Sequence, residues 1–337
     1  MAQTVTLIPG DGIGPSITEA TVRVIEAAGA EIEWDRREAG MAALSLHNTP
    51  IPDETLASIR ASRVSLKGPL TTPSGTGFRS INVALRKEFD LYANVRPART
   101  IVPGGRYEDI DLVLIRENTE GLYSGVEHYV GIGSDPRAAA ESVMLVTRFG
   151  VERIVRYAFE YAVSHGRRKV TLAHKANILK YTQGLFLDIG REIAKEYEGR
   201  VEFEDRIIDA TAMMLVMDPY RFDIIVCENM FGDILSDQIA GLVGGLGLAP
   251  GANIGKDAAI FEAVHGSAPD IAGKGIANPA ALILAAVMML RHLGMHEQAA
   301  RISTALETTI REGDRTTPDL GGTGTTDTFA DALIERL

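Results

Sequence analysis

The sequence has little that could cross-link the chain or anchor it in a membrane. Cys227 is the only cysteine, which excludes an intrachain disulfide and a cysteine-based zinc site and predicts a reducing, cytoplasmic location. The most apolar stretch, residues 279–290, is too short to cross a bilayer and predicts a buried helix instead. The opening MAQTVTLIPGDG has neither the basic segment nor the apolar run of a signal peptide.

Internal repeats, low-complexity tracts and linker-like segments are also lacking. The 337 residues are enough for two domains of ordinary size. Short apolar segments alternate with helical patterns along most of the chain, which indicates an α/β fold. Because no linker separates the halves, we expect the domains to be interleaved rather than strung end to end.

The distribution of charge points to a small anionic ligand. The formal net charge is −11, which argues against nucleic acid or an anionic membrane as a partner. Between Arg60 and Arg106, however, nine basic residues face only two acids. This window could be a solvated basic face. Its arginines alternate with Ser80, Asn82 and a Gly/Pro/Thr loop at 68–77, however, and guanidinium groups with neutral donors suit a site for several carboxylates.

A glycine-rich turn follows the first expected strand, residues 4–8. The sequence PGDGIGP at 9–15 precedes a helical pattern at 16–28 and is reminiscent of a dinucleotide-binding loop. Pro15 directly after the third glycine, and Asp11 where a phosphate would approach, both argue against that interpretation. A tight turn leading into a helix is the favoured prediction.

Two acids lie four residues apart after an expected buried strand at 223–227. On a helix, Asp233 and Asp237 would share one face, and their oxygens suit Mg²⁺ or Mn²⁺. The alternative is that they only complement the helix dipole. A third acid, Asp209, is expected to end a strand at 201–209.

Four further residues have reactive or polar side chains whose roles the local sequence patterns leave open. Lys175 follows an apolar strand and could act as a base or reach to solvent. Tyr123 could pack in a core, and His265 could contact a nucleotide or be structural. Glu228, directly before Asn229, receives no role.

Five long motifs occur together and in order. They are DLYANVRP (90–97), RENTEGLYSG (116–125), AHKANI (173–178), NMFGDILSD (229–237) and FEAVHGSAPDIAGKGIANP (261–279). With them the chain resembles the metal-dependent β-decarboxylating dehydrogenases, which act on isocitrate, homoisocitrate or 3-isopropylmalate. The resemblance is closest to the NAD-dependent isocitrate dehydrogenases.

The resemblance implies a two-domain α/β fold that is not a Rossmann fold and has an inserted middle domain. Residues 1–91 and 252–337 would form the large, nucleotide-binding domain. Residues 92–120 and 148–251 would form the small domain, with the substrate and metal sites and the dimer interface. Residues 121–147 are expected to form an arm or clasp.

The same resemblance implies roles for individual residues in a homodimer with shared sites. Arginines would bind the substrate carboxylates, and a serine and an amide would help to hold the third one: Arg86, Arg96, Arg116, Ser80 and Asn82. Asp233 and Asp237 would bind the divalent cation together with Asp209 of the partner subunit. Tyr123 and the partner's Lys175 would transfer protons.

The resemblance also places a nicotinamide cofactor. The implied cofactor residues are Thr72, His265, Gly266, Ser267, Ala268, Asp270, Ile271 and Asn278. A carboxylate at Asp270 would accept hydrogen bonds from the adenosine ribose and repel a 2′-phosphate, which favours NAD over NADP. Asn278 would contact the adenine.

The expected reaction is the NAD-dependent oxidative decarboxylation of isocitrate to 2-oxoglutarate and CO₂, a step of the tricarboxylic acid cycle. Three alternatives stay open at this point. The substrate could be homoisocitrate or 3-isopropylmalate, or the chain could be a non-catalytic regulatory subunit of a hetero-oligomer.

Overall fold

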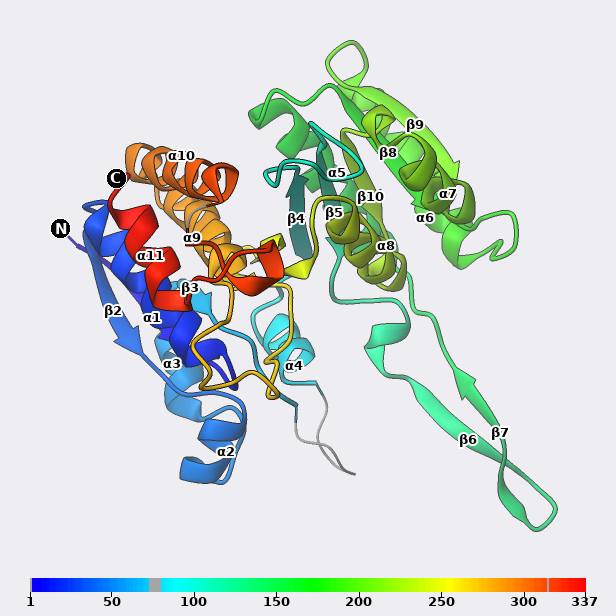
Figure 1. The fold of residues 1–337 in the computed structure, drawn as a ribbon. Coiled ribbons are helices and arrows are strands. Elements are labelled where there is room, and N and C mark those ends of the chain that lie inside the picture. The colour runs from blue at the N-terminus through cyan, green and yellow to red at the C-terminus, as the bar shows by residue number, and fades with distance from the viewer. Residues whose placement is uncertain (1, 73–79, 314) are drawn as a thin grey trace.

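The computed structural model describes residues 2–72, 80–313 and 315–337 (Figure 1). Residues 73–79, which include Arg79 and half of the predicted 68–77 loop, lie outside this range. One sheet runs through the body of the molecule. In spatial order its strands are β2 (Ile32–Arg36), β1 (Gln3–Ile8), β3 (Val64–Lys67), β12 (Ala259–Ala263), β11 (Pro250–Ile254), β4 (Ala93–Arg99), β5 (Asp111–Glu117), β10 (Ile224–Cys227), β8 (Lys169–His174) and β9 (Glu202–Ile207).

The sheet consists of two parallel halves joined through antiparallel strands. β2, β1, β3 and β12 are parallel, and so are β5, β10, β8 and β9. Between the halves, β11 pairs antiparallel with both β12 and β4, and β4 pairs antiparallel with β5. The two halves therefore run in opposite directions, and β11 and β4 lie where they meet.

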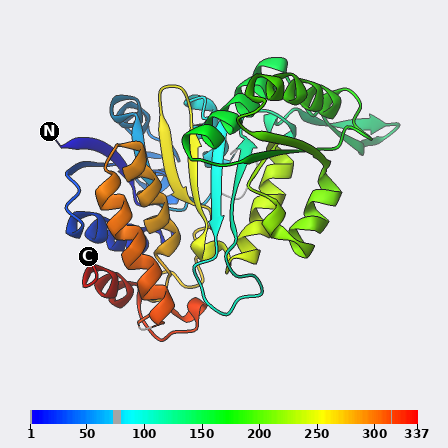
Figure 2. The same cartoon turned by 90° about the horizontal axis from the view of Figure 1, so that it is seen from above.

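Helices cover the sheet, as the two views show (Figures 1 and 2). They are α1 (Gly14–Ala27), α2 (Met41–His47), α3 (Asp53–Ser62), α4 (Ile81–Glu88), α5 (Arg148–Ser164), α6 (Thr182–Ala194), α7 (Ile208–Met217), α8 (Asn229–Leu242), α9 (Ala280–His292), α10 (His296–Glu312) and α11 (Thr326–Ile334). The first and last parts of the chain lie together, because α1 packs against α9 and α11.

In the second half of the sheet, helices pack on both faces, and alternate side chains of one strand contact different helices. Val113 and Ile115 belong to the same apolar cluster as α5 and α6, whereas Leu112 and Leu114 pack with α7 and α8. Successive side chains of a strand point to opposite faces, so a continuous apolar strand packs against the helices on both faces of the sheet. The predicted buried strand at 223–227 is confirmed as β10, which is buried throughout and parallel to both neighbours.

The apolar stretch at 279–290 forms α9, and most of its residues are buried, as predicted. Within the described residues, no helix combines the length and apolar character needed to cross a membrane.

One expected element differs from the structure. The strand predicted at 201–209 ends at Ile207, and Asp209 lies in the first turn of α7. The sequence of this helix, IDATAMMLVM, is apolar nearly all round, so it lacks the helical periodicity that would separate it from a strand. An acid in the first turn of a helix complements its dipole.

The glycine-rich stretch at 9–15 forms a tight turn that leads into α1, as predicted, and it packs closely against neighbouring loops. The Asp11 carboxylate accepts hydrogen bonds from the backbone N–H groups of Met41, Ala42 and Thr71. Gly12 has φ +60°, and a Cβ there would lie 2.0 Å from the Ser267 carbonyl oxygen. The turn thus holds the first helix against a loop from the last third of the chain.

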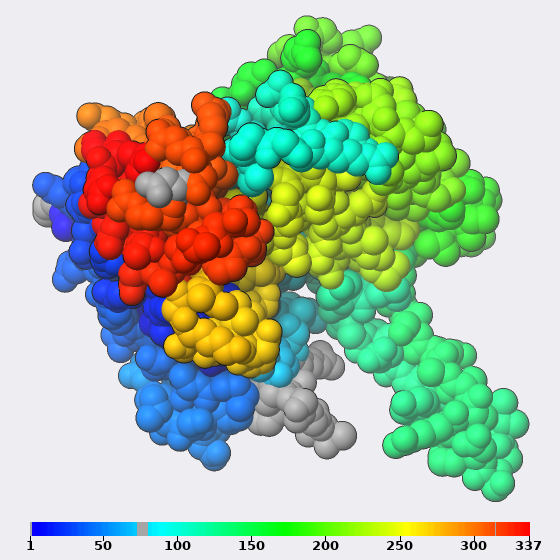
Figure 3. Space-filling view, viewed as in Figure 1, coloured from blue at the N-terminus to red at the C-terminus, as the bar shows by residue number. Residues whose placement is uncertain are grey.

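Residues 121–147 leave the body of the molecule. Strands β6 (Glu127–Ile132) and β7 (Asp135–Ser142) form an antiparallel pair whose side chains are nearly all exposed. The space-filling view shows this arm extending away from the helices (Figure 3). Because one sheet passes through both parts of the body, the domain boundaries at 91, 120, 148 and 251 stay a prediction.

Candidate active site

Arg116, at the end of β5, is the most enclosed residue of the site. Only 1% of it is exposed, although it is a large charged side chain. Its Nε and one terminal nitrogen donate to Asn229 Oδ1 at 3.1 and 2.7 Å, and the other terminal nitrogen pairs with Asp233. Gly232 makes room for it, since a Cβ there would lie 2.5 Å from Arg116 Cγ. The start of α8 is therefore built around this guanidinium.

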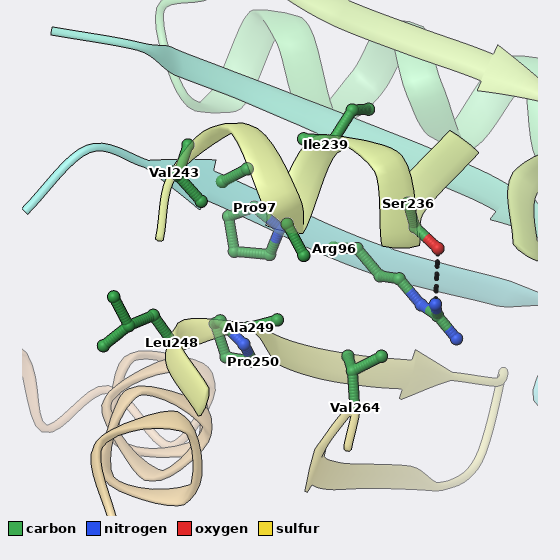
Figure 4. Close-up of a pocket in the computed structure, with 11 residues that line it drawn as sticks. Arg96, Pro97, Ser236, Ile239, Val243, Leu248, Ala249, Pro250 and Val264 are labelled. Carbon is green, nitrogen blue, oxygen red and sulfur yellow. Dashed lines mark hydrogen bonds between the residues drawn. The ribbon is translucent and has the colours of Figure 1, made fainter. Parts of the chain in front are cut away.

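Arg96 of β4 lies beside Arg116 and is also buried. Its Nε donates to Asn94 Oδ1 at 2.7 Å, and its guanidinium also donates to Ser236 and lies 3.5 Å from Asp237. Figure 4 shows the guanidinium turned toward Ser236, while apolar side chains surround the rest of the residue. Burial and the neighbouring Arg116 and Arg86 lower the pKa of Arg96 to about 10, so it is charged at neutral pH.

Arg86 of α4 completes a group of three arginines. Burial lowers its pKa, and Arg116 is close enough to add to this effect. Glu262 lies 3.8 Å from one terminal nitrogen, whereas the buried Nε has no hydrogen-bond partner among the described residues. Asn82 Oδ1 is also buried, with no hydrogen-bond partner in the part of the chain that the structure describes, and Ser80 is the N-cap of α4. Unpartnered buried polar atoms are rare, and here they suit a bound polar ligand.

Tyr123 and two carboxylates face these arginines. Tyr123, in a single 3₁₀ turn at Leu122–Ser124, donates to Asp233 Oδ2 at 2.6 Å. Burial and then this hydrogen bond raise the pKa of Tyr123, which keeps it protonated. Burial acts to raise the pKa of Asp233, but Arg116, Tyr123 and Arg96 outweigh it and leave the pKa below its ordinary value. Burial raises the pKa of Asp237.

The carboxylates fit one part of a divalent cation site. Asp233 and Asp237 project from one helix, and carboxylate oxygens are the ligands that Mg²⁺ and Mn²⁺ prefer. Among the described residues, no group of three or more acids, histidines or cysteines gathers in a way that could hold a metal. One protomer therefore supplies two carboxylates, and a third protein ligand would have to come from elsewhere.

Lys175 and Asp209 are not brought to this cluster. They form an ion pair with each other, and neither contributes to the pKa of Asp233 or Asp237. The hydrogen bond from Lys175 lowers the pKa of Asp209. Asp209 is exposed and Lys175 is half-buried, so the structure separates the predicted site into an enclosed part and a more open part.

A second site lies in the loop after β12. Its pocket has a volume of about 450 Å³ and includes five of the eight predicted cofactor residues among its lining: His265, Gly266, Ala268, Ile271 and Asn278. Burial lowers the pKa of His265, so its ring is neutral, and its buried Nε2 has no hydrogen-bond partner within residues 2–72, 80–313 and 315–337. An apolar, glycine-containing wall with one unpartnered ring nitrogen fits a planar heteroaromatic ligand such as a nicotinamide dinucleotide.

The other three predicted cofactor residues do not line this pocket. Ser267 is buried and shares a 2.6 Å hydrogen bond with Thr71. The hydroxyl of Thr72 accepts from the backbone of Ile81, and Asp270 is exposed. Asn278 donates to Asp319, which limits the contacts left for an adenine.

Several buried polar residues near the site were missed by the sequence analysis. Lys67 and Glu262 form a buried ion pair at 2.7 Å between β3 and β12, beside Arg86. The available signal was a charged residue at the end of an apolar strand, VSLK and AIFEA. Glu228 now has a role, because it caps α8 by accepting from the N–H groups of Met230 and Phe231.

The α/β sheet, a pocket of about 450 Å³ in the loop after β12, and a separate cluster of arginines and carboxylates fit a dehydrogenase-type enzyme that acts on an acidic substrate. The profile of the isocitrate/isopropylmalate dehydrogenase family matches residues 4–333. The chain belongs to this family.

Relatives and a solved structure match over almost the whole chain. The mitochondrial NAD isocitrate dehydrogenase catalytic subunit 5 of Arabidopsis thaliana is 51% identical over 99% of this chain and 88% of its own length. A regulatory subunit of the mitochondrial NAD isocitrate dehydrogenase of Dictyostelium discoideum is 48% identical over 99% of this chain and 92% of its own length. The crystal structure of isocitrate dehydrogenase from Methylococcus capsulatus has 58% identity and a TM-score of 0.95, covering 100% of this chain and 99% of its own.

Proposed function

We propose that this protein oxidises and decarboxylates isocitrate with NAD⁺ and a divalent cation, giving 2-oxoglutarate and CO₂. The observation that carries the proposal is the convergence of three buried guanidinium groups, Arg86, Arg96 and Arg116, beside Asp233. Each guanidinium has an acidic neighbour, but Arg86 Nε has no hydrogen-bond partner within the described ranges. Grouped guanidinium groups bind carboxylates through paired hydrogen bonds, so this cluster is suited to a ligand with several carboxylates.

The choice of isocitrate depends on the start of α4. Ser80 offers a hydroxyl and Asn82 a side-chain amide, and their O–H and N–H groups can donate to a carboxylate. Polar groups there suit a third carboxylate better than the isopropyl group of 3-isopropylmalate. Homoisocitrate, which also carries three carboxylates, is the nearer alternative.

The protein groups divide the work of the reaction. Arg86, Arg96 and Arg116 would hold and orient the substrate carboxylates. When bound, the cation would polarise the substrate oxygen, and the nicotinamide would accept the hydride. Lys175 of the partner subunit, directly or through its paired Asp209, would take the hydroxyl proton at Nζ. Tyr123 would deliver its phenolic proton to the carbon that CO₂ leaves.

The site is proposed to be shared in a homodimer. Asp233 and Asp237 would hold the cation together with Asp209 of the partner subunit. Support comes from exposed apolar side chains on the two helices that carry these acids: Met213 and Met217 of α7 and Ile234 of α8 are each more than half exposed. Apolar patches of this kind are typical of protein interfaces.

NAD is proposed over NADP because Asp270 lies exposed in the loop that borders the pocket. A carboxylate there would repel the 2′-phosphate of NADP. The cytoplasmic location stays a prediction, and the word mitochondrial in the names of the relatives describes those proteins.

The test is turnover by the purified chain alone. With Mg²⁺, isocitrate and NAD⁺, we expect NADH and 2-oxoglutarate to form in equal amounts, with much lower kcat/KM for homoisocitrate and 3-isopropylmalate. A preference for either of those acids would replace the substrate assignment. A protein that binds isocitrate without turnover would be a regulatory subunit instead.

A further inference from the structure

Four polar side chains cross the middle of the sheet on consecutive strands. They are Lys67 of β3, Glu262 of β12, Asn253 of β11 and Asn94 of β4, and we refer to them as the polar row. Lys67 lies directly opposite Glu262 in the strand register, and Asn253 lies directly opposite Asn94. All four are 7% exposed or less. Such a set occupies positions where apolar side chains would normally pack.

Hydrogen bonds connect the row without a break. Lys67 Nζ lies 2.7 Å from Glu262 Oε2, and Asn253 Nδ2 donates to Glu262 Oε1 at 2.7 Å. Asn253 Oδ1 accepts from Asn94 Nδ2 at 2.9 Å. Lys67 and then Arg86 lower the pKa of Glu262 to about 2 in spite of its burial, so it is ionised. A buried network that is fully bonded is rigid, whereas one missing partner makes it unfavourable.

The row reaches two of the substrate arginines, one through Glu262 and the other through Asn94 at its β4 end. Glu262 lies 3.8 Å from Arg86, and Asn94 Oδ1 accepts from Arg96 Nε at 2.7 Å. Arg86 belongs to α4, which leads from the first half of the sheet, and Arg96 belongs to β4, where the halves meet. The row therefore joins two groups that lie on separate elements of the fold.

We propose that Asn253 and Asn94 are positioning residues that hold Arg96 at a fixed distance from Glu262 and Arg86, so that isocitrate meets both arginines in a preformed arrangement. This inference rests on the proposed function, because it assigns the arginines to one substrate. Preformed binding groups need less ordering when a ligand binds.

The competing contacts of Arg96 show why this restraint matters. Asp233 and Asp237 lie 3.7 and 3.5 Å from its terminal nitrogens. Without the Asn94 oxygen, Nε would be a buried donor with no partner, and the guanidinium would turn toward the two carboxylates. Arg96 would then neutralise the acids instead of holding the substrate.

The test compares Asn94→Ala with Asn118→Ala. Asn118 is a matched control, because it is buried and also donates to Asn253 Oδ1, at 3.0 Å, but its side chain donates to Leu91 O and Asn253 rather than bonding to Arg86 or Arg96. Both changes remove one buried amide. For Asn94→Ala we expect the KM for isocitrate to rise about tenfold while the KM for NAD⁺ stays within about twofold, since one oriented hydrogen bond to a charged group is lost. For Asn118→Ala both KM values should stay within about twofold.

Two further variants keep the outcome decisive. Asn94→Asp retains an oxygen for Arg96 Nε but loses the N–H donor to Asn253 Oδ1, so it should restore only part of the isocitrate affinity. If Asn94→Ala does not fold, Asn94→Ser takes its place with the same expectation, because its hydroxyl is too short to reach Arg96.

Equal effects of Asn94→Ala and Asn118→Ala on the isocitrate KM, in an unmodified enzyme that oxidises isocitrate, would overturn the positioning role alone. An unmodified protein without isocitrate turnover would overturn the proposed function. In that case calorimetric titration of isocitrate into the unmodified protein and the two variants decides the positioning role. An equal loss of affinity in both variants, or no binding by the unmodified protein, would overturn it.

Discussion

The two acid–base pairs of the predicted site differ sharply in their surroundings. In the enclosed pair the side chains of Arg116 and Asp233 are 1% and 38% exposed, and Asn229 and Tyr123 hold them in place. In the open pair the side chains of Lys175 and Asp209 are 28% and 65% exposed. No third side chain binds the open pair in the part of the chain that the structure describes. The enclosed pair is thus held within one protomer, whereas Asp209 of the open pair is exposed to solvent, as expected if a second copy completes each site.

The largest effect is expected when two inactive variants are mixed, which tests whether the enclosed and open pairs of one site come from different subunits. Lys175→Ala and Asp233→Asn should each lower kcat by about 10³-fold, within the range for an acid–base group. If sites are shared, random mixing places both defects in one site of each mixed dimer and leaves the other intact. Activity should then return to about a quarter of the unmodified value, since half of the dimers are mixed.

The matched control for mixing is Lys175→Ala with Asp209→Asn. Both changes fall on the open pair, so every site of a mixed dimer keeps one defect and activity should not return. Recovery in this control, or none in the first mixture, would show that the two pairs do not serve a site shared between subunits. The measurement is NADH formation after the variants are refolded together.

Tyr123 offers a test within the enclosed half. Tyr123→Phe removes the proton donor and should lower kcat by about 10²-fold or more, while the KM for isocitrate changes little. The control is Tyr129→Phe, on the exposed arm, which should leave both constants unchanged. A raised KM with unchanged kcat would instead make Tyr123 a binding group.

The contrast between the two pairs also explains what sequence could reveal. Asp233 and Asp237 were found because four-residue spacing on a helix fixes their relation locally. The Lys67–Glu262 ion pair joins strands nearly two hundred residues apart in the sequence, and no local pattern encodes which strands will be neighbours. Asp209 was placed at a strand end because an all-apolar helix such as α7 hides its periodicity. The sequence therefore predicts which side chains share a helix face, but it does not predict which distant strands pair.

A smaller effect is expected in the cofactor loop after β12, where Asp270 is proposed to favour NAD over NADP. Asp270 is exposed and does not line the pocket, so its effect would be electrostatic. Asp270→Lys with Ile271→Tyr should raise the NADP/NAD ratio of kcat/KM by roughly 10- to 100-fold, because a repulsive charge becomes attractive. Asp257→Lys makes the same charge change at another exposed acid and should leave the ratio unchanged. Equal shifts in both variants would indicate a general effect of net charge.

The smallest effect concerns stability, and it separates enclosed carboxylates from open ones. Glu228 is buried at the N-terminus of α8 and accepts from two backbone N–H groups. Glu228→Ala should lower the free energy of unfolding by about 1 kcal/mol, the usual loss for a helix N-cap. Glu228→Gln retains one acceptor oxygen and should lose less. Asp209→Asn should leave the denaturation midpoint unchanged, because exposed ion pairs contribute little. If Asp209→Asn destabilises the protein as much as Glu228→Ala, the Lys175–Asp209 pair is a structural ion pair and its openness has no functional meaning.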